Sequence, residues 1–331
     1  MRAIVYHEYG PPDVLRAADI DEPAAGNDEA LVRICAASVN PADWHFMRGE
    51  PRIARLSFGL RRPKEAILGC DLAGQVEAVG GDVAAVQPGD EVFGCSFMRG
   101  FGAWADRLSV AHPLLAPKPA NLSFEQAAAV PLAGMTALQG LRDHGRVEPG
   151  HNVLIVGAAG GVGTFAVQIA KHLGATVTGV CSTGKADLSR SLGADHVVDY
   201  TREDFTHGER RYDLIFQLAG THSPSECRRA LAPKGMLLLS SGESNGRWIG
   251  PLGRTLKALL LSPFVGQRLV GFTMKPNGDD LQFLRGLIEA GTVTPVIDRT
   301  YPLAEVPDAI RYLEEGHARG KVVIAVQSSD A

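Results

Sequence analysis

A glycine-rich turn in the middle of the chain has the residue types and spacing of a phosphate-binding site. Four apolar residues at 153–156, three of them β-branched, predict a buried strand, and the turn Gly-Ala-Ala-Gly-Gly-Val-Gly at 157–163 follows at once. Residues without side chains let the backbone approach a phosphate, and the N–H groups and positive dipole of a helix start hold its charge. The segment therefore predicts a site for the pyrophosphate of a dinucleotide.

The chain behind this turn predicts the helix that such a site needs. Apolar residues recur from Val162 to Leu173 at the spacing i, i+3, i+4, i+7, i+8 and i+11, and Gly174 supplies a stop. In the usual pattern G-x-G-x-x-G, Ala158 takes the first glycine position, and Gly160 and Gly163 take the other two. A simple packing turn is the alternative, but a strand, a turn and a helix in this order favour dinucleotide binding.

The residues after the next expected strand, 176–180, indicate which dinucleotide binds. An NAD site places Asp or Glu about 20 residues beyond the glycines, where it binds the ribose 2′-hydroxyl. Ser182 stands nineteen residues past Gly163, Thr183 and Lys185 follow, and none of residues 182–185 is acidic. Two hydroxyls and a lysine suit a 2′-phosphate, although a solvated turn with an incidental lysine has the same sequence. We expect NADPH as the cofactor.

Alternating strands and helices must position this site. Further strands are expected at 196–200, 212–218, 236–240 and 269–274, and further helices at 185–192 and 223–231. Alternation with uninterrupted apolar strands predicts a parallel, doubly wound α/β sheet covered by helices on both faces, spanning residues 121–274.

The first 120 residues have a different pattern. Short strands with period-two alternation begin at Ala3, Glu29 and Leu72, and turns such as 87–90 separate them, which predicts a mostly antiparallel β domain. After a stiff link at 117–119, a capping box at 123–126 opens a helix that Pro131 is expected to bend or break. Near the C-terminus, helices are expected from Asp279 and Glu305 and strands at 296–301 and 321–326.

Composition limits the class of protein. The chain has 331 residues, 45% of them hydrophobic and 21% charged, with a net charge of −4, which gives no overall attraction to nucleic acid or to anionic membranes. The longest apolar stretch, near 258–261, is too short to span a bilayer. Five scattered cysteines without a C-x-x-C pair indicate a reducing, cytoplasmic setting and no disulfide framework.

Several ordered segments carry a resemblance to a known family. Residues 36–43, 69–74 and 88–94, then 131–137, the glycine turn, 192–195 and 320–323, resemble the medium-chain dehydrogenase/reductase superfamily, and most of all its zinc-independent quinone oxidoreductases of the zeta-crystallin type. The resemblance implies a GroES-like catalytic domain made of residues 1–120 and 275–331, and a Rossmann domain made of residues 121–274. It also implies a cofactor between the two domains and a homodimer.

Zinc alcohol dehydrogenases share this fold, so the ligand positions are informative. A catalytic zinc takes three protein ligands and keeps one open position. The corresponding positions here hold Asn40, Cys70 and, in the region of the third ligand, Leu132, and the four-cysteine structural lobe is missing after Gly94. We therefore expect no metal, and we interpret Cys70 as a small core residue.

Without a metal, the protein must supply hydrogen bonds to the reacting oxygen. The resemblance places Asn40 beside the nicotinamide, where its amide can donate to an oxygen that gains charge during hydride transfer; the alternative is an Asn-Pro turn bonded to its own backbone. Related enzymes often have a tyrosine five residues further on, where this chain has His45. His45 could donate a proton or could simply line a wall. Trp44, Phe46, Trp248 and Phe272 could form an apolar wall for a flat substrate, or be core.

The predicted function follows from these assignments. We expect an NADPH-dependent reductase that transfers hydride, without metal, to a quinone or to the C=C bond of an α,β-unsaturated ketone or aldehyde. A zinc-type alcohol dehydrogenase and a catalytically idle NADPH-binding protein are the alternatives. A loop at 242–263 is expected to cover the substrate pocket. The expected cofactor contacts are Asn40, Pro41, Thr136, Ala158, Gly160, Gly161, Val162, Gly163, Ser182, Thr183, Lys185, Tyr200, Leu218, Ala219, Ser240, Phe272 and Met274.

Overall fold

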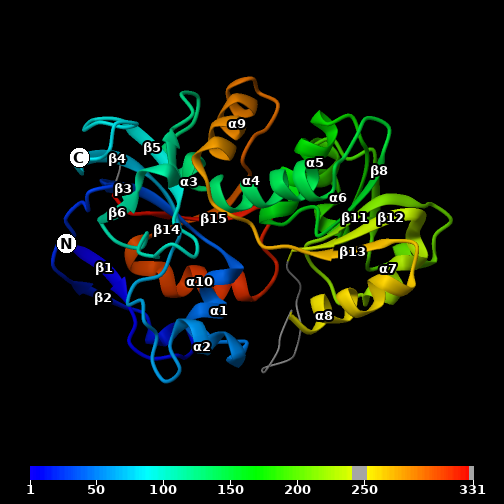
Figure 1. The fold of residues 1–331 in the computed structure, drawn as a ribbon, viewed down its shortest axis with the longest axis horizontal. Coiled ribbons are helices and arrows are strands. Elements are labelled where there is room, and N and C mark those ends of the chain that lie inside the picture. Colours follow the sequence, from blue (N-terminus) through cyan, green and yellow to red (C-terminus); the bar gives the residue numbers. More distant parts are fainter. Residues whose placement is uncertain (241–251, 328–331) are drawn as a thin grey trace. The chain divides into compact units, whose positions relative to one another are not determined.

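The chain folds into two compact units, each with its own sheet (Figure 1). The computed structural model describes residues 1–240 and 252–327. The first unit contains residues 1–135 and 275–331, and the second contains residues 136–274. The later boundary is the expected one, whereas the earlier one lies at 135 rather than 120, because the short helix α3 (Phe124–Ala128) packs on the sheet of the first unit.

A seven-stranded, mainly antiparallel sheet forms the core of the first unit. Its order is β14-β15-β3-β4-β5-β7, and β6 also pairs with β3. The strands are β3 (Glu29–Val39), β4 (Asp71–Val79), β5 (Glu91–Cys95), β6 (Arg107–Ala111), β7 (Leu115–Pro117), β14 (Ile297–Pro302) and β15 (Lys321–Ala325). A separate pair is formed by β1 (Arg2–Val5) and β2 (Arg16–Asp19). The C-terminal strand β15 thus lies inside the sheet, paired with β14 on one side and β3 on the other.

The helices of the first unit include one that the sequence analysis did not predict. Asn40 is the N-cap of α1 (Pro41–Arg48), so the Asn-Pro pair opens a helix: Pro41 needs no N–H bond there, and Gly49 ends the helix at φ +60°. The helix that opens at the capping box is broken before Pro131, which is the second of the two expected outcomes: α3 ends at Ala128, and Pro131 begins the separate helix α4 (Pro131–Leu138). A π-helical turn at Gln139–His144 follows α4. The remaining helices are α2 (Arg55–Phe58), α9 (Gly278–Glu289) and α10 (Val306–Glu314).

The second unit is the predicted parallel α/β sheet. Six parallel strands lie in the order β10-β9-β8-β11-β12-β13. They are β8 (Asn152–Val156), β9 (Thr176–Cys181), β10 (His196–Asp199), β11 (Tyr212–Gln217), β12 (Leu231–Leu239) and β13 (Arg268–Gly271). The connecting helices are α5 (Gly161–His172), α6 (Ala186–Ser191), α7 (Pro224–Ala230) and α8 (Leu252–Leu261).

The start of α7 has the predicted cap. The Ser223 side chain accepts a hydrogen bond from the Glu226 N–H, and Pro224 is the first residue of the helix. Over residues 1–240 and 252–327, the structure contains no helix with both the length and the apolar character needed to cross a bilayer.

Candidate active site

The glycine turn after β8 is held in a shape that only glycine permits at two positions. Gly157 adopts φ +90°, and a Cβ added to Gly163 would lie 2.0 Å from the carbonyl oxygen of Gly157. The start of α5 therefore packs directly against the turn. A Cβ on Gly160 would meet only that same oxygen, at 3.4 Å. Gly163 is required by packing, whereas Gly160 leaves space for a ligand.

Ala158 replaces the first glycine of the usual pattern without strain. The left-handed residue is its neighbour Gly157, so position 158 does not need glycine's freedom. The Ala158 methyl lies 2.9 Å from where a Cβ on Gly179 would be, so the glycine in β9 makes room for it. The N–H groups of Gly157 and Ala158 both donate to the carbonyl of Val180, at 3.0 and 3.1 Å. The turn is thus tied to the sheet, and the first N–H groups of α5 remain for an anion.

The other expected cofactor residues of the second unit lie at one edge of its sheet. Because the strands are parallel, the residues that follow each strand meet at the same edge. Ser182 follows β9, Tyr200 follows β10, Leu218 and Ala219 follow β11, Ser240 follows β12, and Phe272 and Met274 follow β13. Thr136 lies on α4 and is buried. The expected contacts that follow these strands thus lie at the carboxyl ends of the sheet, the edge at which open α/β sheets bind ligands.

Asp199, a residue that the sequence analysis missed, lies at the end of this site where the 2′-phosphate is expected. The Thr183 hydroxyl donates to the Asp199 carboxylate, and the Thr201 hydroxyl donates to it at 2.7 Å. These hydrogen bonds lower the pKa of Asp199, so the carboxylate is ionised. The one feature of the sequence that could have indicated Asp199 is its position as the last residue of β10, next to the expected contact Tyr200.

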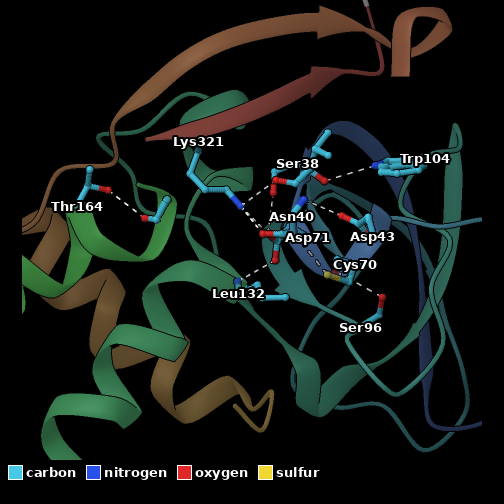
Figure 2. Close-up of polar contacts among 12 residues, drawn as sticks. Ser38, Asn40, Asp43, Cys70, Asp71, Ser96, Trp104, Leu132, Thr164 and Lys321 are labelled. Carbon is cyan, nitrogen blue, oxygen red and sulfur yellow. Dashed lines mark hydrogen bonds and ion pairs between the residues drawn. The ribbon is translucent and has the colours of Figure 1, made fainter. Parts of the chain in front are cut away.

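The first unit has a buried network of charged and polar side chains around Asn40 (Figure 2). Lys321 Nζ donates to Asn40 Oδ1 at 2.5 Å and lies 3.4 Å from Asp71 Oδ2. Asn40 Nδ2 donates to the same carboxylate oxygen at 3.0 Å, and the Ser38 hydroxyl donates to it at 2.7 Å. The Leu132 N–H donates to the other oxygen of Asp71 at 2.8 Å. Asn40, Asp71 and Lys321 are exposed by 2%, 0% and 3%.

A second carboxylate, Asp43, lies on the same helix start. Asp43 Oδ2 accepts the backbone N–H of Asn40 at 2.7 Å, which caps α1. Complete burial raises the pKa of Asp43 to about 7; the Asn40 N–H opposes this shift, the Asp71 charge adds to it and Lys321 opposes it. Asn40 is thus held through its backbone by Asp43 and through its side chain by Asp71 and Lys321.

The His45 ring is bonded to the backbone through one nitrogen. Its Nδ1 lies 3.2 Å from the carbonyl oxygen of Glu50, which can only accept, so the Nδ1 proton is directed there. Burial lowers the pKa of His45, which disfavours the imidazolium at neutral pH. Trp44 stacks on the ring at a centroid distance of 3.6 Å. These observations favour His45 as a wall residue over a proton donor.

The expected aromatic wall does not form one cluster within a unit. Phe46 packs against Phe58 and Phe101 in the first unit, with centroid distances of 4.3 and 4.8 Å. Phe272 packs against Phe216 and His144 in the second unit. Trp248 and residues 242–251 of the expected loop lie outside the described residues, and α8 forms much of the rest of that loop.

One cluster in the described part of the chain has metal-ligand chemistry, but it does not fit zinc. Ligand atoms of Cys70, Asp71 and Cys95 lie within 4.8 Å of one another. Both oxygens of Asp71 already accept hydrogen bonds, and the Lys321 ammonium next to them would repel a divalent cation. A hydrogen bond with Cys95 and burial raise the pKa of Cys70, and burial raises that of Cys95, so both stay protonated thiols. Cys70 is fully buried, as a core residue is.

Two protein families match the chain. The Alcohol dehydrogenase GroES-like domain matches residues 26–120, and Zinc-binding dehydrogenase matches residues 192–324. A 2-methylene-furan-3-one reductase of Solanum lycopersicum and an NADPH-dependent alkenal/one oxidoreductase, chloroplastic, of Arabidopsis thaliana are each 35% identical, over 98% of this chain and 79% of their own length. The structure of a quinone oxidoreductase from Coxiella burnetii is 31% identical, covers 99% of both chains and superposes with a TM-score of 0.88.

Proposed function

This chain belongs to the medium-chain dehydrogenase/reductase superfamily, in its zeta-crystallin-like branch. We propose that it catalyses its reaction without a bound metal ion. It is an NADPH-dependent oxidoreductase that reduces a quinone or the C=C bond of an α,β-unsaturated ketone or aldehyde. The name of the Arabidopsis relative, an NADPH-dependent alkenal/one oxidoreductase, supports both the cofactor and the substrate class.

The observation that carries the metal-free proposal is the network at Asn40. An alcohol dehydrogenase of this fold needs a Lewis acid to activate the oxygen bound to the reacting carbon. Here the three ligand positions hold the Asn40 amide, the protonated thiol of Cys70 and the apolar Leu132, and the neighbouring Asp71 carboxylate is paired with Lys321, so this set of groups does not fit zinc. A conjugated acceptor needs less activation, because hydride adds to the far carbon and the charge spreads to the oxygen.

The residues of this chain have separate tasks in the proposed reaction. The N–H groups at the start of α5 and the glycine turn bind the pyrophosphate, and Ser182 and Lys185 bind the 2′-phosphate, because the hydroxyl of the third expected residue, Thr183, donates to Asp199 instead. NADPH, when bound, supplies the hydride. Asn40 donates a hydrogen bond to the substrate oxygen as it gains charge. The proton that completes the reduction comes from solvent, because burial lowers the pKa of His45 and its Nδ1 proton is directed at the Glu50 carbonyl oxygen.

The test is NADPH consumption with matched acceptors. Simple quinones and short enones should be reduced, the corresponding saturated ketones should not, and a strong chelator should leave the rates unchanged. Stoichiometric zinc together with loss of activity on chelation would establish the alcohol dehydrogenase alternative. Tight NADPH binding without turnover of any acceptor would establish the idle binding protein.

Assembly and location belong to the same proposal. All five cysteines are free thiols, which supports a reducing, cytoplasmic location. We propose a homodimer that binds a small-molecule substrate and neither nucleic acid nor membrane. Light scattering should give twice the chain mass of 35.2 kDa; a monomer mass at working concentrations would refute the dimer.

A further inference from the structure

Lys321 is in an unusual place for a lysine. It is the first residue of β15, it is 3% exposed, and its ammonium lies among Asn40 Oδ1, Asp71 Oδ2 and the Val39 carbonyl oxygen. Lysine is almost never fully buried without a partner, and a buried ion pair often adds nothing to stability compared with apolar residues of the same size. The pair of Lys321 with Asp71 therefore needs a reason other than stability.

The geometry of the Asn40 amide gives that reason. An ammonium can only donate hydrogen bonds and a carboxylate can only accept them. In the observed orientation the amide oxygen faces Lys321 and the amide nitrogen faces Asp71 (Figure 2). A flipped amide would place N–H groups against the ammonium and the oxygen against the carboxylate. The charges of the pair thus allow one orientation and exclude the other.

The Lys321 contact also strengthens the amide as a donor. A cation at the amide oxygen draws electron density from the amide nitrogen, which makes the N–H groups better donors at low dielectric. Within residues 1–240 and 252–327, the second Nδ2 proton has the Cys70 sulfur as its one hydrogen-bond partner, at 3.7 Å, and a thiol sulfur is a weak acceptor. That proton is the one the amide can give to a ligand.

We propose that Lys321 and Asp71 are positioning residues for the reaction: they fix and polarise the Asn40 amide so that its second N–H is directed at the substrate oxygen. This inference rests on the proposed function of Asn40. The competing explanation is purely structural, since the network also joins the ends of β3, β4 and β15.

The experiment compares two double variants. Each removes one ion pair that joins the N-terminal part of the first unit (residues 1–135) to its C-terminal part (residues 275–331). Lys321→Met/Asp71→Asn removes the two charges that contact the Asn40 side chain, so neither member of the pair is left behind as an unpaired charge. Arg48→Met/Glu314→Gln removes the pair that joins α1 to α10, with an Nε–Oε1 distance of 2.6 Å, and touches no atom of Asn40. Both proteins should fold, with melting temperatures within about 5 °C of wild type.

The kinetic readout separates positioning from structure. In Lys321→Met/Asp71→Asn, kcat should fall about 100-fold, as it does when an oxyanion donor is lost, with KM for NADPH nearly unchanged. In Arg48→Met/Glu314→Gln, kcat should stay within about threefold of wild type. Equal kcat losses in the two variants, or an unchanged kcat in the first, would overturn the proposal.

A spectroscopic readout keeps this inference distinct from the proposed function. With asparagine side chains labelled with ¹⁵N, the Asn40 amide should give two separate, exchange-protected proton signals, assigned by their loss in Asn40→Ala. Lys321→Met/Asp71→Asn should lose the protection and Arg48→Met/Glu314→Gln should keep it. If the Asn40 signals are protected in the wild type and in Arg48→Met/Glu314→Gln but not in Lys321→Met/Asp71→Asn, the positioning role holds, even in a protein that reduces no quinone or enone; the absence of reduction would then refute the proposed function alone. If the Asn40 signals of the wild type are not protected, the positioning role is refuted.

If Lys321→Met/Asp71→Asn does not fold, the exchange variant Asn40→Asp/Asp71→Asn decides the question. It keeps Lys321, one amide and one carboxylate, but position 40 can then only accept hydrogen bonds. We expect NADPH binding with kcat reduced about 100-fold or more. Retained kcat would overturn the proposal.

Discussion

The two units offer their functional groups to ligands in different ways. In the second unit the groups are mostly backbone N–H groups at the ends of parallel strands, and a seven-residue turn shapes the site. In the first unit they are side chains at the ends of strands from both halves of the chain, with Asn40 and Lys321 separated by 281 positions. A backbone site depends on local sterics, whereas a side-chain site depends on the whole sheet being assembled. Substitutions in the glycine turn should therefore act locally on ligand binding, whereas changes to distant strands of the first unit should disturb its side-chain site.

The largest effect on folding should come from removing β14 and β15, the two C-terminal strands in the sheet of the first unit. A chain ending at Met274 loses β14 and β15, exposes the edge of β3 and leaves the buried Asp71 without Lys321. We expect it to aggregate, because an unpaired apolar strand edge and a buried unpaired charge are both strongly unfavourable. Solubility and cooperative thermal unfolding are the measurements. A chain ending at Gln327 is the control and should behave as wild type; a soluble, active chain ending at Met274 would contradict the arrangement.

The next effect is a pH dependence specific to the first unit. Because burial raises the pKa of Asp43 to about 7, the folded state binds more protons than the unfolded state between pH 4 and 7. The stability that this group contributes is full below about pH 4 and is lost as the pH rises through 7. The wild type therefore loses stability as the pH rises from 4 to 8, and Asp43→Asn does not. Over this range the free energy of unfolding of Asp43→Asn should rise by roughly 2–4 kcal/mol relative to that of the wild type. Urea unfolding of both proteins across this range is the measurement, and parallel pH profiles would refute the assignment.

A smaller effect tests the backbone site. In Gly163→Ala the new methyl would lie 2.0 Å from the Gly157 carbonyl oxygen, so the turn must shift. We expect a loss of about 1–3 kcal/mol in stability and a loss of NADPH affinity, since the N–H groups of α5 move with the turn. Gly160→Ala is the matched control: with 3.4 Å to the same oxygen, it should cost about 0.5 kcal/mol in stability. Equal destabilisation by the two substitutions would mean that the turn is not held as described.

The smallest effect concerns the choice of cofactor. Lys185→Ala should weaken NADPH about tenfold, equivalent to about 1.4 kcal/mol, and leave NADH nearly unchanged. Lys234→Ala removes an exposed lysine of the same unit and should change neither affinity. Fluorescence titrations with both cofactors are the measurement. If Lys185→Ala weakens both equally, the lysine is structural; equal wild-type affinities would contradict the 2′-phosphate assignment.

The difference between the units also explains what could be predicted from the sequence. The strand and the helix on either side of the glycine turn, the parallel sheet and the caps at Ser123 and Ser223 depend on residues a few positions apart, and these structural predictions were confirmed. The Asp71–Lys321 pair escaped prediction because no local pattern marks two charges that meet only in the folded sheet. The helix α1 was missed although local signals for its start are present, with Asn40 at the N-cap, Pro41 at the first helical position and Asp43 at the third; the Asn-Pro pair was considered as a turn instead. Asp199 was missed because it faces Thr183 across two neighbouring strands.

The central claim is that a metal-free site built around Asn40 directs hydride from NADPH to a conjugated carbon. The most direct test is to reduce 3-buten-2-one with NADPH deuterated at C4, in the presence of a strong chelator, and to locate the deuterium by NMR. We predict butan-2-one with the deuterium on C4, the former β-carbon. An unsaturated alcohol with the deuterium on the carbinol carbon, or a reaction abolished by the chelator, would contradict the account.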